Sequence, residues 1–373
     1  MNFYIKVTFN NTQCHLTIDN DNNLVIMNQI QMMTFPLNLD ANIVWRQENN
    51  FLKGFEINAF LFLGDHHDLL KLKSILGQLV TYKKISNMYN FLSTLGKGNY
   101  SQVCLLQCKI THKLYAAKCM KKENNEVIND IKREIHIWSM LQHKNVARFY
   151  EVYESTNTIY VVMEKLNKLR NDYDHEEIKL IMKAILEGVN YIHSKNIIHR
   201  DLKIDNILID DENQIKIIDF GLACQFINIE SRNISCGTPG YIAPEVLINK
   251  PFDFKSDIFS IGVVMYQLYF NKHLFRAEQV VDILKLNKKF TISRLSVLDI
   301  PDCGYQFLRS LLNHNPLQRI TASQALSHWY MNSIKEEHFT KVPRNPNPKF
   351  KDHLNTCIIM CSKTTITSYN KIQ

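Results

Sequence analysis

Residues 198–208 read Ile198-His199-Arg200-Asp201-Leu202-Lys203-Ile204-Asp205-Asn206-Ile207-Leu208, and this stretch decides how the rest of the chain is interpreted. Two further segments follow it, Asp219-Phe220-Gly221 and Gly237-Thr238-Pro239-Gly240-Tyr241-Ile242-Ala243-Pro244-Glu245. Carboxylate and amide oxygens, such as those of Asp219 and Asn206, are of the hard type that magnesium accepts. A lysine close to them can offset the charge of a phosphoryl group.

Upstream of this stretch, residues 95–103 form a glycine-rich segment, Leu-Gly-Lys-Gly-Asn-Tyr-Ser-Gln-Val. Glycines suit a turn between two strands that must bring backbone amides close to a phosphate chain. Ser101 is small enough to replace a third glycine. The segment therefore indicates a phosphate-binding turn, although such a pattern alone is a weak signal.

A lysine and a glutamate follow the glycine-rich segment. Lys118 ends the strand predicted over residues 114–118, and a lysine that points inward from a sheet needs an anionic partner or a phosphate. Glu134, in the amphipathic segment 130–141, is a candidate partner. Such pairs are common on protein surfaces, so this one gains meaning only from the other segments.

Taken together, these segments resemble a eukaryotic protein kinase of the Ser/Thr type. Residues 89–330 hold the glycine-rich loop, strand lysine, helix glutamate, His-Arg-Asp, Asp-Phe-Gly and Ala-Pro-Glu in the order of that family. Lys203 and Thr238 have the Ser/Thr forms of the catalytic and substrate-docking loops. Residues 315–322 and 328–330 are most similar to the calcium/calmodulin-dependent kinase group. The resemblance implies an α+β, two-lobed kinase fold that binds ATP and Mg2+ and acts on protein substrates.

The resemblance also implies how the nucleotide is held. Lys118 would bind the α- and β-phosphates and be aimed by its ion pair with Glu134, while the glycine-rich loop covers the phosphates. Val103, Ala116 and Leu208 would enclose the adenine, beside a hinge that follows Met163. The residues implied for ATP are Leu95, Gly96, Lys97, Gly98, Asn99, Tyr100, Ser101, Val103, Ala116, Lys118, Glu134, Met163, Glu164, Leu166 and Leu208.

Four residues would carry the chemistry by the same resemblance. Phosphoryl transfer passes through a loose transition state, so the protein mainly positions reactants and neutralises charge. Asp201 would orient the substrate hydroxyl and take its proton late, and Lys203 would offset charge on the transferring group. Asn206 and Asp219 would hold the metal.

Three further positions match structural residues of the family. Asp257 resembles the buried aspartate that holds the His-Arg-Asp backbone. Glu245 and Arg319 match a buried ion pair that ties the Ala-Pro-Glu segment to the lower lobe. Removal of one partner would leave an unpaired buried charge, which costs about 3 to 5 kcal/mol.

The activation segment departs from the family pattern. Ile234 lies where related kinases often carry an activating phosphothreonine, so Arg200 lacks its usual phosphate partner there. Ser231 or Ser235 would serve after phosphorylation, and Glu230 would serve without it. The alternative that no phosphorylation is needed stays open. Asp205 is acidic where some basophilic kinases bind an arginine, which favours basic substrates.

Residues 1–83 predict a small antiparallel domain of several strands and one helix. Apolar residues alternate over residues 3–9 and 14–18, and Asp65 can cap a helix. The further predicted strands are 24–27, 43–45, 51–57 and 60–63, and the predicted helix carries Leu69, Leu72, Leu76 and Leu79 on one face.

This order of elements resembles a pleckstrin-homology domain, but it lacks two features of that family. The helix has no tryptophan, and the first hairpin offers only Lys6 as a cation. A phosphate pocket without paired cations has little to offset its ligand's charge, so binding of a membrane phosphoinositide is the disfavoured alternative. A docking or autoinhibitory module is the favoured interpretation.

Composition bounds the remaining possibilities. The 373 residues are 45% hydrophobic and 21% charged with a net charge of +8, as in a globular protein. The basic residues are spread along the chain, so nucleic acid is not an expected partner. No apolar stretch approaches the roughly 18 residues of a membrane-spanning helix, and no secretory leader is evident, so we expect a cytoplasmic, unprocessed protein. Oligomeric state stays open, and residues 331–373 predict an irregular tail.

Two alternatives compete with an active kinase. A pseudokinase scaffold would bind nucleotide or partners without turnover, but the loss of Lys118, Asp201 or Asp219 that would favour it is not seen. In the second alternative, the first domain is a recruitment module and the kinase is its cargo. Deletion of the first domain separates these possibilities. Loss of partner or membrane association at an unchanged catalytic rate would indicate recruitment, whereas a rise in activity would indicate autoinhibition.

Overall fold

The computed structural model describes residues 4–98, 101–291 and 300–332. The chain divides into two compact units. The first comprises Met1–Lys132 and Arg148–Lys165, and the second comprises Arg133–Ala147 and Leu166–Gln373. The predicted residues Asn99 and Tyr100, and nearly all of the predicted tail, lie outside the described residues.

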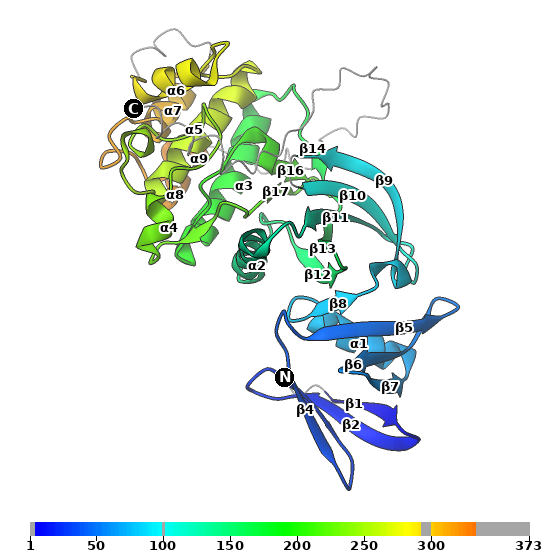
Figure 1. Cartoon of the computed structure of the whole chain (residues 1–373). Helices are drawn as coiled ribbons and strands as arrows, with labels where there is room; N and C mark the ends of the chain where they lie inside the picture. Colours follow the sequence, from blue (N-terminus) through cyan, green and yellow to red (C-terminus); the bar gives the residue numbers. More distant parts are fainter. Residues whose placement is uncertain (1–3, 99–100, 292–299, 333–373) are drawn as a thin grey trace. The chain divides into compact units, whose positions relative to one another are not determined.

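Between residues 4 and 64 the first unit has seven antiparallel strands, which form a small sheet-rich module (Figure 1). The order in the sheet is β4-β3-β2-β1-β7-β6-β5. The bounds are β1 Tyr4–Phe9, β2 Thr12–Ile18, β3 Asn23–Met27, β4 Met32–Pro36, β5 Asn42–Glu48, β6 Phe51–Ile57 and β7 Phe60–Gly64. Six of these strands correspond to the strands predicted from the sequence, two of them from alternation of apolar residues, and β4 was missed.

Helix α1 (His66–Leu76) completes the module. The side chain of Asp65 accepts hydrogen bonds from the backbone amides of His67 and Asp68, which confirms the predicted cap. Leu69, Leu72 and Leu76 are fully buried in the module's core. Leu79 does not belong to the helix face as predicted, because the helix ends at Leu76.

The sheet of this module continues into a second set of strands, and this continuation was not predicted from the sequence. Strand β8 (Thr81–Lys83) runs parallel to β5 on one side and to β12 (Phe149–Glu154) on the other. The described residues thus form one 13-stranded sheet that ends in the order β8-β12-β13-β11-β10-β9. The remaining bounds are β9 Tyr89–Lys97, β10 Ser101–Cys108, β11 Leu114–Lys121 and β13 Thr158–Glu164.

Helix α2 (Asn125–Ser139) contributes its first half to the first unit and its second half to the second unit. Its bounds correct the prediction for residues 130–141 by several residues at the start. Strand β11 likewise continues to Lys121 instead of ending at Lys118.

The second unit is mainly helical, and two apolar helices form its core. Most residues of α3 (His175–Ser194) and α5 (Phe254–Phe270) are buried, and Asp174 and Asp253 cap their N-termini. The other helices are α4 Ile229–Asn233, α6 Val280–Lys288, α7 Asp302–Leu311, α8 Ala322–Leu326 and α9 Trp329–Asn332, with 3-10 turns η2 Ile204–Asn206 and η3 Val246–Ile248. Its short strands are β14 Asn167–Lys168, β15 Ile197–Ile198, β16 Ile207–Ile209, β17 Ile215–Ile217 and β18 Cys224–Gln225.

The fold class is confirmed: a mixed helix-and-strand region follows a small antiparallel sheet with one helix. Within the described ranges, none of the helices has the length and apolar character that crossing a bilayer requires.

Candidate active site

Asp201, Lys203 and Thr238 form a closed, buried arrangement in the second unit. The Nζ atom of Lys203 donates to Asp201 Oδ2 and to Thr238 Oγ1, both at 2.9 Å. The Thr238 hydroxyl donates in turn to Asp201 Oδ1 at 2.6 Å. Asp201 and Lys203 are only 5% and 3% exposed. The structure therefore brings together three of the predicted residues, from the catalytic loop and the substrate loop.

The buried environment changes the pKa values of this pair. Burial raises the pKa of Asp201 above its usual range, although the charge of Lys203 and the hydrogen bond from Thr238 oppose this effect. For Lys203, burial alone would lower the pKa, but the Asp201 carboxylate outweighs it and the pKa is raised. Lys203 therefore stays protonated at neutral pH and keeps a positive charge beside Asp201.

Asn206 offers a buried oxygen that lacks a hydrogen-bond donor within the residues that the structure describes. Its Nδ2 donates to the backbone oxygen of Asp201 at 2.8 Å, which leaves Oδ1 without a partner. Buried acceptors in proteins are nearly always satisfied, so an open amide oxygen at this place suits a metal ligand.

The backbone of Asp219 lies close to that of Asn206 in the fold, although the two residues are well separated in the sequence. In the β16–β17 hairpin Ile207 pairs with Ile217, and the amide of Ile218 donates to the Asn206 oxygen at 3.0 Å. Asp219 follows directly and has a left-handed backbone with φ 67°, which a non-glycine residue rarely adopts. The hairpin thus brings the backbones of Asn206 and Asp219 close together, and both residues carry side-chain oxygens of the kind that magnesium accepts.

Asp257 anchors the backbone at the start of the catalytic loop. Its Oδ2 accepts from the amide of His199 and its Oδ1 from the amide of Arg200, both at 2.9 Å. His193 Nε2 lies 2.9 Å from the same Oδ2. Burial alone would raise the pKa of Asp257, but these hydrogen bonds and the nearby histidines hold it below its usual range. Sequence reasoning missed His193, for which the only signal was a histidine in the last turn of a helix that precedes the loop.

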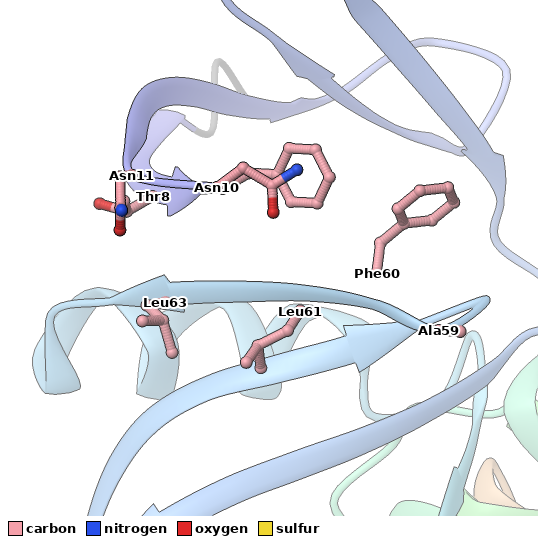
Figure 2. Close-up of a pocket in the computed structure, with 8 residues that line it drawn as sticks. Thr8, Asn10, Asn11, Ala59, Phe60, Leu61 and Leu63 are labelled. Carbon is pink, nitrogen blue, oxygen red and sulfur yellow. The ribbon is translucent and has the colours of Figure 1, made fainter.

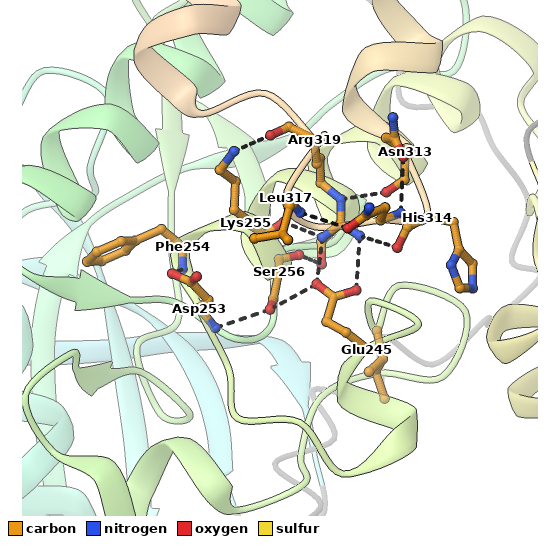
Figure 3. Close-up of polar contacts among 12 residues, drawn as sticks. Glu245, Asp253, Phe254, Lys255, Ser256, Asn313, His314, Leu317 and Arg319 are labelled. Carbon is orange, nitrogen blue, oxygen red and sulfur yellow. Dashed lines mark hydrogen bonds and ion pairs between the residues drawn. The ribbon is translucent and has the colours of Figure 1, made fainter.

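Glu245 and Arg319 form a bidentate ion pair (Figure 3). The Nη1 and Nη2 atoms of Arg319 lie 2.6 and 2.9 Å from the two carboxylate oxygens of Glu245. Arg319 also donates to the backbone oxygens of Lys255 and Asn313 at 2.7 and 2.9 Å. Only 1% of Arg319 is exposed. These hydrogen bonds satisfy nearly every donor of its buried guanidinium. The pair links the end of the substrate loop to the segment before α8.

Arg200 bonds to the backbone of the activation segment. Its Nε donates to the Leu222 oxygen at 2.5 Å, and its Nη1 donates to the Ser231 oxygen. Its guanidinium also lies 5.5 Å from the centre of the Phe252 ring. In the described part of the chain, its partners are thus carbonyls and a ring, and the predicted partners Glu230 and Ser235 are not among them.

The predicted nucleotide residues are divided between the two units. In the first unit, Gly96 and Lys118 lie opposite Val103 on either side of β10, and Ala116 lies opposite Met163 across β11 and β13. The amide of Gly98 donates to the Ser101 oxygen at 2.7 Å. The other members of the first unit are Leu95 and Lys97 on β9 and Glu164 on β13.

Glu134 on α2, Leu166 and Leu208 on β16 belong to the second unit. Lys118 and Glu134 are 6% and 5% exposed, so both charges are shielded from water. Ionised side chains are rarely buried unless paired, so burial of both agrees with a functional role for each.

A pocket of about 270 Å3 lies beside the substrate loop. Asp205 and Thr238 line it, together with His273 and Arg276 from the segment after α5. Sequence reasoning named Asp205 but not Arg276, which brings a positive charge to the same pocket. The pocket therefore offers both signs of charge to a substrate.

Comparison with known proteins identifies the family. A profile of the protein kinase domain family matches residues 89–331. The chain is 33% identical over 309 residues to calcium-dependent protein kinase 5 of Plasmodium falciparum (isolate 3D7), with 78% of this chain and 54% of that protein covered. It is 32% identical over 285 residues to the probable cell cycle serine/threonine-protein kinase CDC5 homolog of Encephalitozoon cuniculi (strain GB-M1), with 72% and 60% covered. The chain spans little more than half the length of these relatives, and it belongs to the protein kinase domain family.

Proposed function

We propose that the chain is an ATP-dependent protein serine/threonine kinase, which transfers the γ-phosphoryl group of ATP to Ser or Thr hydroxyls of protein substrates. The observation that carries the proposal is the closed contact of Asp201, Lys203 and Thr238 beside the open Oδ1 of Asn206. A carboxylate, a fixed cation and a metal-binding oxygen within one loop are what phosphoryl transfer needs.

In the proposed reaction, Asp201 accepts a hydrogen bond from the substrate hydroxyl and orients it toward the γ-phosphorus. The new O–P bond forms as the bond between the γ-phosphorus and the β,γ-bridging oxygen breaks, ADP leaves, and the hydroxyl proton passes to Asp201. Lys203 offsets charge on the transferred group. Asn206 and Asp219 would hold Mg2+, which offsets the charge of the phosphates when bound.

The nucleotide roles are part of the same proposal. Lys118 binds the α- and β-phosphates and pairs with Glu134, while residues 95–101 cover the phosphates. Val103, Ala116 and Leu208 enclose the adenine, next to the hinge after Met163. Support comes from the burial of Lys118 and Glu134 and from the register that sets Val103 beside Lys118.

We further propose a pleckstrin-homology-like fold for residues 1–83 and a place in the calcium/calmodulin-dependent kinase group for residues 89–330. Seven antiparallel strands followed by one helix support the first assignment. The name of the Plasmodium relative agrees with the second, whereas the Encephalitozoon relative is named as a cell-cycle kinase.

The first module has a pocket that suits an apolar ligand better than a phosphate. A pocket of about 450 Å3 lies between the turn after β1 and strand β7 (Figure 2). Asn10, Asn11, Phe60, Leu61 and Leu63 are among its lining residues, and the lining includes neither Lys nor Arg. Phosphates are recognised by paired cations, so this pocket is not suited to a phosphoinositide headgroup.

The test is transfer of labelled γ-phosphate from Mg-ATP to a generic basic protein. The wild-type chain is compared with Asp201→Asn and Lys118→Met, and with Asp172→Asn as a control whose side chain is 92% exposed. We expect transfer to Ser and Thr that falls by orders of magnitude in the first two variants and stays unchanged in the control. Tight binding of Mg-ATP by the wild type without any transfer would instead support the pseudokinase alternative.

A further inference from the structure

Strand β8 lies inside the 13-stranded sheet and joins the strands of the first module to those of the kinase domain. Its residues Thr81 and Tyr82 pair with Asn42 and Ile43 of β5, and the same residues pair with Val152 and Tyr153 of β12. β12 is the outer strand of the five-stranded kinase sheet, so β8 covers an edge that would otherwise carry unpaired backbone groups. The first module is therefore joined to the kinase sheet by backbone hydrogen bonds and not by a free linker.

A buried ion pair crosses the same junction (Figure 1 shows its elements α1 and β12). Lys73 of α1 bonds to Glu151 Oε1 of β12, and both residues are at most 8% exposed. The other carboxylate oxygen of Glu151 accepts from the hydroxyls of Tyr153 and Tyr89 at 2.8 and 3.1 Å. Burial lowers the pKa of Lys73 to about 7.

Close backbone contacts at the end of α1 reinforce the junction. A Cβ atom built on Gly77 would lie 2.2 Å from the backbone oxygen of Tyr150, so no larger residue fits there without a shift of the backbone. Gln78 donates from Nε2 to the Phe149 oxygen at 2.5 Å. Helix α1 thus ends directly against β12.

The module also touches the helix that carries the predicted partner of Lys118. Lys132 of α2 lies 2.7 Å from Asp40, in the turn between β4 and β5. Glu134 follows Lys132 by two residues in the same helix. The side chains of Lys132 and Asp40 are 45% and 79% exposed. An exposed ion pair of this kind contributes little free energy. The pair therefore favours one position of the helix, while the buried contacts supply most of the stabilisation.

We propose that residues 4–83 are a built-in positioning element of the kinase, which holds β12 and the first half of α2, the helix in which Glu134 lies. Lys73, Gly77 and Asp40 are its positioning residues. The module acts neither as detachable cargo nor as an inhibitor that must leave. The effect on catalysis rests on the proposed kinase function, whereas the effect on β12 and α2 does not.

The experiment measures hydrogen exchange and kinetics on the full chain. The variants are Lys73→Met, with the exposed Lys71→Met two positions away as control, and Gly77→Ala, with Gly64→Ala as control because a Cβ there would meet only side chains. We expect amides of residues 125–139 and 149–154 to exchange about tenfold faster in the two interface variants than in their controls. The kcat/KM for ATP should fall by a similar factor, mainly through KM.

A charge exchange tests the contact with α2 without disturbing the buried core. Asp40→Lys should raise KM for ATP, and the double variant Asp40→Lys/Lys132→Asp should restore it, which loss of folding alone would not do. Unchanged exchange in β12 and α2 in both interface variants would overturn the proposal, and so would higher activity in either. Exchange needs no turnover, so a wild-type chain without transferase activity would refute the kinase assignment and leave this proposal to be decided by exchange.

Discussion

The catalytic loop and the junction between α1 and β12 both bury charged side chains, but they satisfy them differently. At the junction, Glu151 receives hydrogen bonds from Lys73, Tyr89 and Tyr153. In the catalytic loop, Asn206 keeps a buried oxygen without a donor among the described residues, and burial raises the pKa of Asp201.

The difference teaches how the two regions contribute. A saturated buried network stabilises one arrangement of the chain, and its loss leaves a charge unpaired. A site that keeps an open acceptor and a costly carboxylate is less stable than it could be, which agrees with the roles proposed above for Asn206 and Asp201. Replacement of a buried carboxylate should therefore destabilise the chain more in the first kind of region than in the second.

The largest expected effect is on activity in the catalytic loop. Asp201→Asn should lower kcat by about 100- to 10,000-fold, because the amide cannot take the substrate's proton. Steady-state phosphorylation of a basic protein measures this, with circular dichroism as the check on folding. A variant that keeps more than a tenth of wild-type kcat would remove Asp201 from the catalytic role.

The next largest effect is on the stability of the folded chain, through the buried ion pair of Glu245 and Arg319. Arg319→Met leaves Glu245 buried and unpaired, which should lower the free energy of unfolding by about 3 to 5 kcal/mol. Arg309→Met, at an exposed position of α7, is the matched control. Urea denaturation measures both variants, and the double variant Glu245→Leu/Arg319→Met should recover part of the loss because it removes both charges. A loss below about 1 kcal/mol, the range of exposed pairs, would contradict the comparison.

The third prediction contrasts two buried aspartates by pH. The pKa of Asp257 is lowered in the folded chain, so its contribution is present above the unfolded pKa of about 3.9 and is lost as pH falls through the folded value. The pKa of Asp201 is raised, so its ionised form destabilises the folded chain at neutral pH, and this penalty disappears as pH falls through the folded value.

Thermal unfolding at several pH values measures the contrast. At pH 7, Asp257→Asn should lower the melting temperature strongly. Asp201→Asn should lower it less, because it relieves the cost of burying that carboxylate while it leaves Lys203 without an ionised partner. Toward acid pH, the difference between each variant and the wild type should shrink. Equal destabilisation by both variants at pH 7 would show that the buried polar groups of the catalytic loop are as fully hydrogen-bonded as those around Asp257.

Local patterns made the catalytic region predictable from the sequence. Asp201, Lys203 and Asn206 lie within six consecutive residues, so a short ordered motif brings them together. The same holds for β1 and β2, where alternation of apolar residues follows directly from a half-buried sheet. Asp257 and Arg319 are distant in sequence, and only the family resemblance pointed to their partners.

The junction was beyond sequence reasoning because its contacts are non-local. Lys73 and Glu151 are separated by 78 positions, and β8 is a three-residue strand without periodicity. The partners of Arg200 were also hidden, because the carbonyls of Leu222 and Ser231 belong to the backbone, which every residue type shares. Sequence patterns reveal side-chain chemistry, but they carry little information on which backbone carbonyl accepts a hydrogen bond from a given side-chain donor.

The smallest expected effect concerns the activation segment. Arg200 already donates to two backbone carbonyls and lies over Phe252, so a phosphate is not required to satisfy its buried charge. Ser231→Ala and Ser235→Ala, alone or together, should change kcat/KM by less than about threefold, which corresponds to under 1 kcal/mol. Phosphatase treatment of the wild type, followed by mass spectrometry of the segment and the same assay, provides the control. A loss of about a hundredfold in either serine variant, with recovery in a Glu variant, would show instead that the carbonyls only replace a phosphate in the inactive chain, and that this region is as open as the Asn206 site.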